Sequence, residues 1–189
     1  MKPEIVTEMP SVLLRPLQVQ DADELLLLVN HNHEYLRAWL PWLDDAKTRN
    51  DQVKFIQRCS ECALKETEFH YAVLVDGDIA GMISFHHIDK RNRSATIGYW
   101  LPRSMTGQGI MTAAVKALIA EGFEDLELNR IQARVETSND PSQAVCERAG
   151  FKKEGVLREA EWLYDHYVDI TMNAVLKSEW RKSATHPLS

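Results

Sequence analysis

Hydrophobic and polar residues alternate with two different periods along this chain, and each period predicts one kind of element. Alternate positions and short runs of β-branched or aromatic residues predict strands at residues 12–17, 69–75, 79–87, 95–101, 131–135, 151–157 and 167–175. Apolar residues spaced three and four positions apart predict helices at residues 22–30, 33–40, 49–65, 110–121 and 141–149. The order of these elements predicts one α+β domain with a mixed, mostly antiparallel sheet.

Turn and cap residues locate several ends of these elements. Asp76 and Gly77 separate two predicted strands, which is a strong signal for a tight hairpin. Gly122 is predicted to occupy the C′ position just beyond the end of the fourth helix, where glycine is favoured. Asp140 is predicted to be the N-cap of the fifth helix, with Pro141 at its first position. These signals leave only short connections and no interdomain linker.

Length and composition are those of one globular domain. The chain has 189 residues, 44% of them hydrophobic and 26% charged, so we expect a single domain with its core at about residues 12–180. The tail after Lys182 is expected to fray. No apolar run approaches the roughly 18 residues of a membrane span, and the first residues lack the apolar core of a signal peptide. We therefore expect a cytoplasmic protein with no membrane contact.

Net charge and cysteine spacing argue against some partners. The formal net charge of −6 is unsuited to nucleic acid, whose phosphates require a basic surface, and mildly favours a cationic acceptor such as a protonated amine. Cys59 and Cys62 form a C-x-x-C pair, but the pair falls within a helical pattern and no second ligand pair follows it. We therefore expect ordinary thiols and no metal cofactor.

The stretch most informative about function is residues 94–112, which reads SATIGYWLPRSMTGQGIMT. It joins a predicted strand to a predicted helix through Gly107, Gln108 and Gly109. Glycines allow a close backbone approach and N–H groups at a helix N-terminus favour an anion, so this arrangement suits a phosphate group. Two alternatives stay open on the loop alone: a turn that needs two glycines, and a dinucleotide fingerprint in which Thr112 replaces the third glycine.

A longer match decides between these alternatives. IGYWLPRSMTGQGIMTAAVKALIAEGF, followed by RIQARVETSNDPSQAVCERAGFKKEG, resembles the GNAT acetyltransferases, and within them the RimJ/RimL branch, which acetylates protein N-termini. The resemblance extends over residues 13–180. It implies the GNAT fold, in which the two strands that flank the cofactor helix splay apart and leave a V-shaped slot. One position departs from the family pattern Q/R-x-x-G-x-G/A, because Ser104 stands where Gln or Arg is usual.

The resemblance assigns acetyl-CoA to the slot beside residues 95–101. It implies that the backbone of Tyr99, Trp100 and Leu101 pairs with the pantetheine arm, and that one N–H there polarises the thioester carbonyl. Asn139 is expected to bond the same arm, although it also suits a plain turn, and Trp100 also suits the core. The pyrophosphate is expected on the backbone N–H groups of Thr106, Gly107, Gln108, Gly109, Ile110, Met111 and Thr112.

The resemblance also implies which groups move protons. Many family members use a Tyr seven residues after the Asn to protonate the leaving thiolate, but this chain has Cys146 there. The RimL-like branch uses a Ser three residues after the Asn, and Ser142 occupies that position. Its base is a Glu between the last two strands, which corresponds to Glu161, with Glu159 as the neighbouring competitor. Taken alone, Ser142 is a common helix-start serine and Glu161 a solvated carboxylate.

The acceptor that the branch implies is the N-terminal α-amine of a ribosomal protein, of the serine type. An α-amine, with a pKa of about 7.7–8.0, needs less help from a base than a lysine amine near 10.4, which fits a modest carboxylate. A small amine, polyamine or antibiotic is an alternative acceptor, and a non-catalytic acyl-CoA sensor is an alternative of another class. The apolar residues 39–43 form either a wall of the acceptor site or part of the core. The branch also suggests a homodimer.

Overall fold

The computed structural model describes residues 2–180, and the tail that was expected to fray lies outside them. Within these residues the strands form one eight-stranded sheet. In chain order they are β1 (Ile5–Val6), β2 (Val12–Pro16), β3 (Phe69–Val75), β4 (Asp78–Asp89), β5 (Ser94–Trp100), β6 (Arg130–Glu136), β7 (Lys152–Leu163) and β8 (His166–Leu176).

The order across the sheet is β1-β2-β3-β4-β5-β6-β8-β7, and all neighbours are antiparallel except β5 and β6. The predicted mixed, mostly antiparallel sheet is therefore confirmed. The parallel pair is short, running only from Ser94 opposite Arg130 to Ile97 opposite Ala133. Beyond that point each strand pairs only with its outer neighbour, so β5 and β6 diverge as the resemblance implied.

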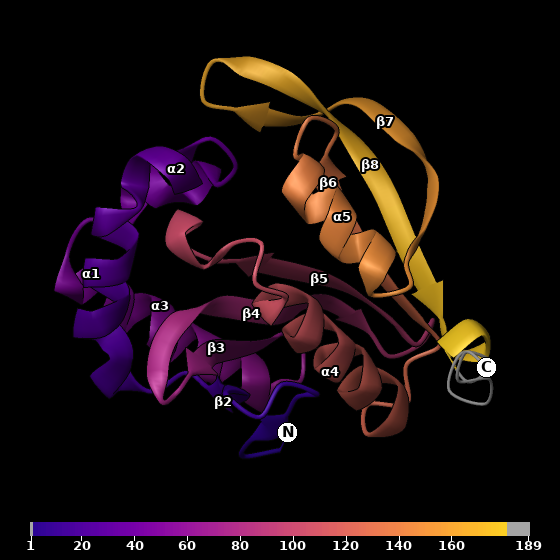
Figure 1. Ribbon diagram of the computed structural model, residues 1–189, viewed down its shortest axis with the longest axis horizontal. Helices are drawn as coiled ribbons and strands as arrows, with labels where there is room; N and C mark the ends of the chain where they lie inside the picture. The colour runs from indigo at the N-terminus through magenta and orange to yellow at the C-terminus, as the bar shows by residue number, and fades with distance from the viewer. Residues whose placement is uncertain (1, 181–189) are drawn as a thin grey trace.

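Helices cover both faces of this sheet (Figure 1). They are α1 (Ala22–His31), α2 (His33–Arg37), α3 (Arg49–Leu64), α4 (Ile110–Glu124) and α5 (Asp140–Arg148), with short 3-10 turns η1 (Val19–Asp21), η2 (Pro41–Asp45) and η3 (Arg103–Met105). In Figure 1 the long β7–β8 hairpin arches above α5, while α1, α2 and α3 gather at the opposite side. None of the helices in residues 2–180 is both long enough and apolar enough to cross a membrane.

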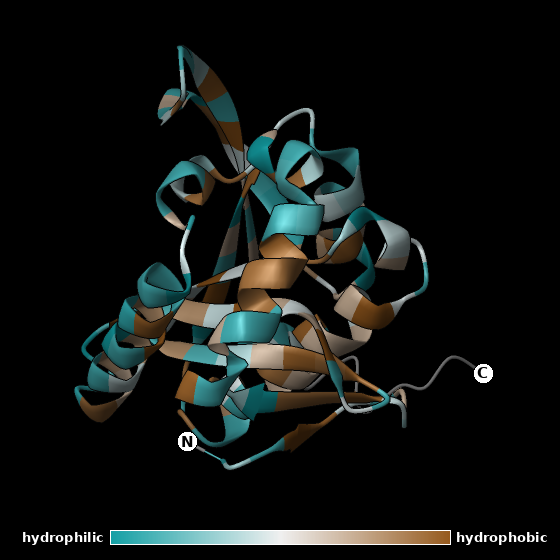
Figure 2. Ribbon diagram, turned by 90° about the vertical axis from the view of Figure 1, so that its left-hand side faces the viewer, coloured by the Kyte–Doolittle hydropathy of each residue, from teal (hydrophilic) through white to brown (hydrophobic). Residues whose placement is uncertain are grey.

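Two hydrophobic clusters lie on opposite faces of the sheet, because alternate residues of a strand point to opposite sides. On β3, Tyr71 and Val73 pack with residues of α4 and α5, whereas Ala72 and Leu74 pack with residues of α1 and α3. Figure 2 shows hydrophobic and hydrophilic segments alternating along the helices, as amphipathic helices on a sheet require. The first cluster fixes α4, whose N-terminus faces the gap between β5 and β6.

Gly122 does not end α4, so that prediction was wrong. The helix continues to Glu124, and Gly122 is buried within it. A Cβ atom on Gly122 would lie 2.8 Å from Ile131 Cδ1 and 2.8 Å from Phe85 Cζ. Such distances are too short for non-bonded carbon atoms, so glycine is needed here to let α4 pack closely on the sheet.

The N-cap of α5 is one residue earlier than predicted. Asn139, not Asp140, caps the helix, because its Oδ1 accepts a hydrogen bond from the Ser142 N–H at 3.2 Å. Asn and Asp are nearly equal as N-caps, so the sequence did not rank these two neighbours. Pro141 consequently occupies the second helical position and Ser142 the third. The hairpin prediction, in contrast, is confirmed: β3 and β4 are joined by a turn at residues 76–77 with φ of 52° and 99°.

Candidate active site

The divergence of β5 and β6 leaves backbone groups without strand partners in the middle of the sheet. Residues 98–100 of β5 pair with β4 on one side, but with no strand on the side that faces β6. Residues 134–136 of β6 likewise pair only with β8. An extended ligand can therefore hydrogen-bond to this inner edge as an added strand would. The predicted slot is present, and it begins after Ile97.

A glycine loop and the start of α4 form one wall of the slot. Gly107 and Gly109 have positive φ, 74° and 80°, which residues with a Cβ atom disfavour. The first bond within α4 runs from the Ala113 N–H to the Gly109 carbonyl at 3.0 Å, so the three preceding N–H groups have no acceptor in the helix. These donors, at the positive end of the helix dipole, suit a phosphate group.

The first turns of α5 form the opposite wall. Tyr99 reaches across from β5, where its hydroxyl donates to the Ser142 carbonyl at 3.1 Å and lies 3.5 Å from Cys146 Sγ. Burial raises the pKa of the Tyr99 hydroxyl well above its usual value, and burial also raises the pKa of the Cys146 thiol. Both groups are therefore neutral near pH 7, and Cys146 is a buried thiol packed beside a phenol.

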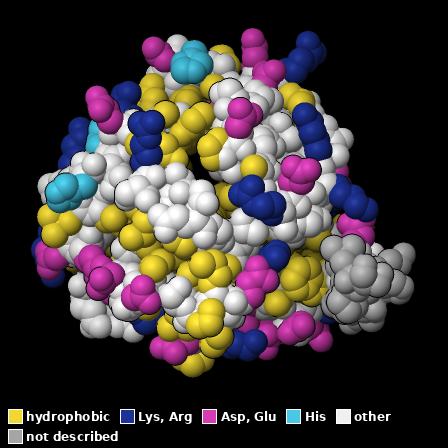
Figure 3. Space-filling view, in the orientation of Figure 1, with side chains coloured by type: hydrophobic (Ala, Val, Ile, Leu, Met, Phe, Trp, Pro, Cys, Tyr) yellow, Lys and Arg dark blue, Asp and Glu magenta, His cyan; other side chains and the backbone are white. Residues whose placement is uncertain are grey.

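These walls enclose a cleft of about 400 Å³, which we call the splay cleft. Figure 3 shows this face of the molecule hollowed near its centre, with hydrophobic side chains around the opening. The volume lies within the usual range for small-molecule sites, roughly 300–1,000 Å³. Predicted site residues that line the cleft are Tyr99, Trp100, Leu101, Thr106, Gly107, Gly109, Ile110, Met111, Thr112, Asn139 and Ser142.

Two predicted site residues do not line the splay cleft. The Gln108 side chain turns back and donates to the Ser104 carbonyl at 2.9 Å. Glu161 lies on β7, opposite Val168 of β8, and not on a connection between the last two strands. That expectation was wrong because β7 continues to Leu163, well past the apolar pattern that predicted its end.

Glu161 forms an ion pair with Arg134 of β6, with 2.9 Å between Oε1 and Nη2. The neighbours of Arg134 on β6, Ala133 and Val135, are buried against the cluster that contains α4 and α5. Alternation along the strand therefore places Arg134 and Glu161 on the opposite face of the sheet.

Arg148 is a lining residue that the sequence patterns did not reveal. It belongs to the last turn of α5, and its Nε donates to Thr112 Oγ1 in the first turn of α4 at 3.2 Å. This bond ties together the two helices that flank the cleft. It also places a guanidinium beside the free N–H groups of α4, where it can pair with a phosphate. No local pattern could reveal it, because the two residues meet only when the helices pack.

A further contact joins the two halves of the sheet at the open end of the slot. Tyr164, in the turn between β7 and β8, donates its hydroxyl to the Leu40 carbonyl at 2.8 Å. The Arg37 guanidinium lies over the Tyr164 ring, 3.7 Å from its centroid, and also pairs with Asp44 at 3.0 Å. The β7–β8 turn is therefore held against the segment that connects α2 with η2.

A second cavity, of about 500 Å³, lies on the face covered by α1 and α3, and we call it the helix-side cavity. Leu40, Tyr99 and Trp100 line both this cavity and the splay cleft, so the two spaces meet at the end of β5. Residues 39–43 divide between this cavity and the core. Leu40 and Trp42 line the helix-side cavity, whereas Leu43 is buried in the core.

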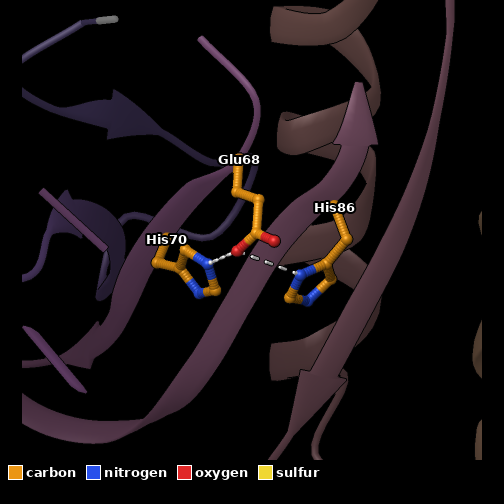
Figure 4. Close-up of side chains that lie close together, drawn as sticks. All are labelled: Glu68, His70 and His86. Carbon is orange, nitrogen blue, oxygen red and sulfur yellow. Dashed lines mark hydrogen bonds and ion pairs between the residues drawn. The ribbon is translucent and has the colours of Figure 1, made fainter. Parts of the chain in front are cut away.

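A cluster of polar side chains at one end of the helix-side cavity was also missed (Figure 4). His70 Nε2 lies 2.8 Å from Glu68 Oε2, and His86 Nδ1 lies 3.7 Å from the same oxygen. His86 Nε2 also hydrogen-bonds Ser84 Oγ at 2.7 Å. A signal existed in the sequence, because residues 84 and 86 are spaced by two on one predicted strand and so share a face, and residue 70 lies on the adjacent predicted strand.

Both histidines of this cluster are neutral near pH 7. Burial lowers the pKa of His70, and burial with a smaller effect of His70 lowers the pKa of His86 to about 4. Two imidazoles and a carboxylate within 4.8 Å of one another also match the donor set of a zinc site. However, the Glu68 oxygen points between the two rings in Figure 4, and Arg58 brings a positive charge within 3.7 Å of it. The hydrogen bonds of this cluster are those between Glu68 and His70 and between Ser84 and His86.

The chain matches the model of the acetyltransferase (GNAT) domain over residues 11–152. It belongs to the GNAT acetyltransferase family. Among curated relatives of this GNAT chain is the putative ribosomal N-acetyltransferase YdaF of Bacillus subtilis (strain 168), which is 36% identical over 172 residues, 89% of this chain and 93% of the relative. Another is the ribosomal-protein-serine acetyltransferase of Escherichia coli (strain K12), 30% identical over 171 residues, 90% of this chain and 96% of the relative.

Solved structures agree with this assignment. The GNAT chain is similar to RimL, a ribosomal L7/L12 alpha-N-protein acetyltransferase in complex with coenzyme A, with a TM-score of 0.87, 28% identity, and coverage of 91% of this chain and 97% of that one. The expected fold and RimL-like relationship are therefore confirmed. The protein is an acetyl-CoA-dependent N-acetyltransferase. Its splay cleft fits this cofactor, because a free strand edge suits the pantetheine amides and the loop N–H groups suit the pyrophosphate.

Proposed function

We propose that this enzyme transfers the acetyl group to the N-terminal α-amine of a protein. The observation that carries the proposal is the splay cleft, where a free strand edge, a glycine loop and Ser142 come together. The finer assignment, a serine at the start of a ribosomal protein, is supported by the names of the relatives in Bacillus subtilis and Escherichia coli. A small amine is the second candidate acceptor, because the cleft also opens onto the helix-side cavity.

In the proposed complex the backbone holds most of the cofactor. The inner edge of β5 at Tyr99, Trp100 and Leu101 pairs with the pantetheine arm, and the loop N–H groups of residues 106–112 bind the pyrophosphate. Asn139 bonds the arm through its amide nitrogen, since its Oδ1 already caps α5. The thioester that the cofactor supplies then lies at the opening of the slot, where a backbone N–H can polarise its carbonyl.

Ser142 is the proposed acid and Glu161 the proposed base. Ser142 lines the cleft at the third position of α5, where its hydroxyl can give a proton to the departing thiolate. Glu161 lies on the opposite face of the sheet, paired with Arg134, and removes the proton of the amine directly or through a water molecule. The two groups thus act at opposite ends of the reacting bonds.

The first experiment identifies the acceptor. The wild-type enzyme is incubated with acetyl-CoA and a panel of peptides with free N-termini, lysine-containing peptides with blocked N-termini, and small amines that include spermidine. Mass spectrometry is expected to show one added acetyl group on the free peptide N-termini. Acetylation of small amines alone would contradict the proposal that a protein N-terminus is the acceptor. Binding of acetyl-CoA without any product would instead support a sensor.

Kinetics of two variants test the proton transfers. Ser142→Ala and Glu161→Ala should each lower kcat roughly 10²- to 10⁴-fold at neutral pH and leave acetyl-CoA affinity unchanged. In Glu161→Ala the rate should recover as the pH approaches the pKa of the acceptor amine, because the amine then deprotonates without help. In Ser142→Ala no comparable recovery is expected.

Two neighbours supply matched controls. Ser138→Ala removes a serine that lies outside the splay cleft, and Glu159→Ala removes the competing carboxylate of β7. Both should keep near-wild-type kcat. If Glu161→Ala keeps full kcat at pH 7 while Glu159→Ala loses it, the base is Glu159 and the assignment of Glu161 is wrong.

A further inference from the structure

We propose that the helix-side cavity binds the first side chain of the acceptor and favours a large apolar one, while the Ser84 hydroxyl, oriented by His86, accepts a hydrogen bond from the acceptor backbone. This inference rests on the proposed α-amine acceptor and names the class of its first residue. Serine is then accepted, but with a lower kcat/KM than leucine or phenylalanine.

The first argument is the position of the cavity at the opening of the sheet. Gly98 is the first residue of β5 beyond the last pair with β6, and it pairs with Ser84 of β4. A Cβ atom on Gly98 would lie 3.2 Å from His86 Nε2 and 3.8 Å from Ser84 Oγ, so these polar atoms cover Gly98 on the face of the sheet that lines the helix-side cavity, next to the start of the slot. An amine that reaches a thioester held along Tyr99 and Trp100 passes within about one strand spacing, ~4.8 Å, of them.

The second argument is the apolar character of the space beyond these atoms. Its walls come from α1, η2, α3 and β4, and they include Leu25, Val29, Trp42, Phe55 and Met82. A serine side chain would leave most of the roughly 500 Å³ without contacts, whereas a leucine or an aromatic ring can fill it. Burying such a side chain favours binding by roughly ten- to a hundredfold, so the difference is measurable.

The third argument is the balance of charge around the cavity. Asp45 and Asp51 in the lining are balanced by Lys54 and Arg58. Glu68 is not a lining residue, and its carboxylate is bonded by His70. A polyamine carries several positive charges and requires a clearly acidic lining, which this cavity lacks. The acceptor that fits has one amine and an apolar body.

His86 acts in this proposal as a positioning residue and not as a base. With a pKa of about 4 it is a poor match for proton abstraction near neutral pH. The charged and titratable groups that face it are Glu68, His70, His87 and Arg58, and burial has the largest effect. Its Nε2 holds Ser84 Oγ at 2.7 Å, and a hydroxyl bonded in this way keeps a lone pair for the acceptor N–H.

The test uses peptides of one sequence that differ only in the first residue, which is Ser, Ala, Leu or Phe. Wild-type kcat/KM should be roughly tenfold or more higher for Leu and Phe than for Ser. Val29→Phe, which fills the cavity from α1, should remove this preference by raising KM for the Leu and Phe peptides. Leu27→Phe is the matched control, because Leu27 lies on the same helix and is 58% exposed.

The opposite outcomes overturn the proposal. A wild-type preference for Ser or Ala would do so, and so would a preference for Leu and Phe that survives in folded Val29→Phe. Overfilling a core, as in Val29→Phe, can prevent folding. Trp42→Ala, at the partly exposed wall of the cavity, is therefore a second variant that tests the proposal. It should lower kcat/KM for the Phe peptide and leave that for the Ser peptide within a few-fold.

The positioning role of His86 is tested by comparing the effects of its substitution on KM and on kcat. His86→Leu should raise KM for all four peptides with little change in kcat, and His86→Gln, which keeps a hydrogen-bonding nitrogen, should restore most of the loss. A fall in kcat at unchanged KM, or activity that depends on added zinc and is lost with a chelator, would overturn the positioning role.

Failure of the proposed function can be told apart from failure of this inference. If no peptide is acetylated, the α-amine acceptor fails. Calorimetry of the Phe and Ser peptides with the coenzyme A complex still tests the cavity. Tighter binding of the Phe peptide, weakened by Val29→Phe, would support the cavity, and equal or absent binding would overturn it.

Discussion

The splay cleft and the helix-side cavity share three lining residues and meet at the end of β5, but they are built from different parts of the chain. In the splay cleft the groups proposed to hold the cofactor are mostly backbone, namely the inner edge of β5, a loop with positive φ at Gly107 and Gly109, and the first N–H groups of α4. The helix-side cavity consists of side chains from α1, η2, α3, β3, β4 and β5, which converge only in the folded protein.

Because of this difference, the two sites tolerate different kinds of amino-acid substitution. A backbone site accepts many side-chain changes and is damaged where a Cβ atom forces a new conformation. A site made of side chains can change its preference with one substitution while the fold stays intact. We therefore expect changes to the backbone conformation of the glycine loop to lower cofactor affinity whichever acceptor is used, and variants of the helix-side cavity to change the choice of acceptor.

The largest of the remaining effects is expected for Gly109→Val. A Cβ atom there has room, since its nearest neighbour would be Met9 Sδ at 3.8 Å, so the cost lies in the backbone conformation at φ 80°. Strain of this kind costs about 1–3 kcal/mol, and its relief would move the N–H groups of the loop. Acetyl-CoA affinity, measured by calorimetry, should fall roughly 10- to 100-fold while the protein stays folded.

Gly155→Val is the matched control for this change. Gly155 lies on β7, its φ is outside the left-handed region, and a Cβ atom there would have no neighbour within 4 Å, so its replacement should leave affinity unchanged. Unchanged affinity in folded Gly109→Val would show that this loop does not bind the phosphates. It would also remove the contrast between a backbone site and a side-chain site.

The same contrast explains what the sequence could predict. Gly107, Gly109 and the strand before them are contiguous, so local rules located the cofactor wall and the resemblance gave its role. Arg148 depends on packing between two helices that are distant in the sequence, and no local rule found it. The cluster around His86 depends on the pairing of two adjacent strands, and the spacing of residues 84 and 86 was a weak signal for it. Gly122 was misplaced because the same residue type serves at helix ends and at close helix–sheet contacts.

The helix-side cavity should make stability depend on pH. The pKa of His86 is about 4 in the folded protein, and an unfolded histidine titrates near 6.5. Between these values the unfolded chain binds more protons, so the free energy of unfolding falls as the pH drops from about 6.5 to 4. Urea unfolding should show a loss of about 1–2 kcal/mol between about pH 7.5 and pH 5.

His86→Gln should remove most of this loss, because glutamine does not titrate. His70, whose pKa is also lowered by burial, accounts for the part that is left. Equal pH dependence in wild type and His86→Gln would show that His86 is solvated, and the cavity would then not be the apolar space described above.

The smallest effect is expected for Cys146→Ala, at a residue that is buried on α5 beside Tyr99 and does not line the splay cleft. Cys146 stands where many family members have a proton-donating Tyr, but its thiol is buried against Tyr99 and burial raises its pKa. As a packing residue it should leave kcat within a few-fold of wild type, as should Cys59→Ala, a buried thiol on the opposite face. Loss of roughly 10²-fold or more in kcat, the scale of a missing acid, would assign the proton transfer to Cys146 and displace Ser142.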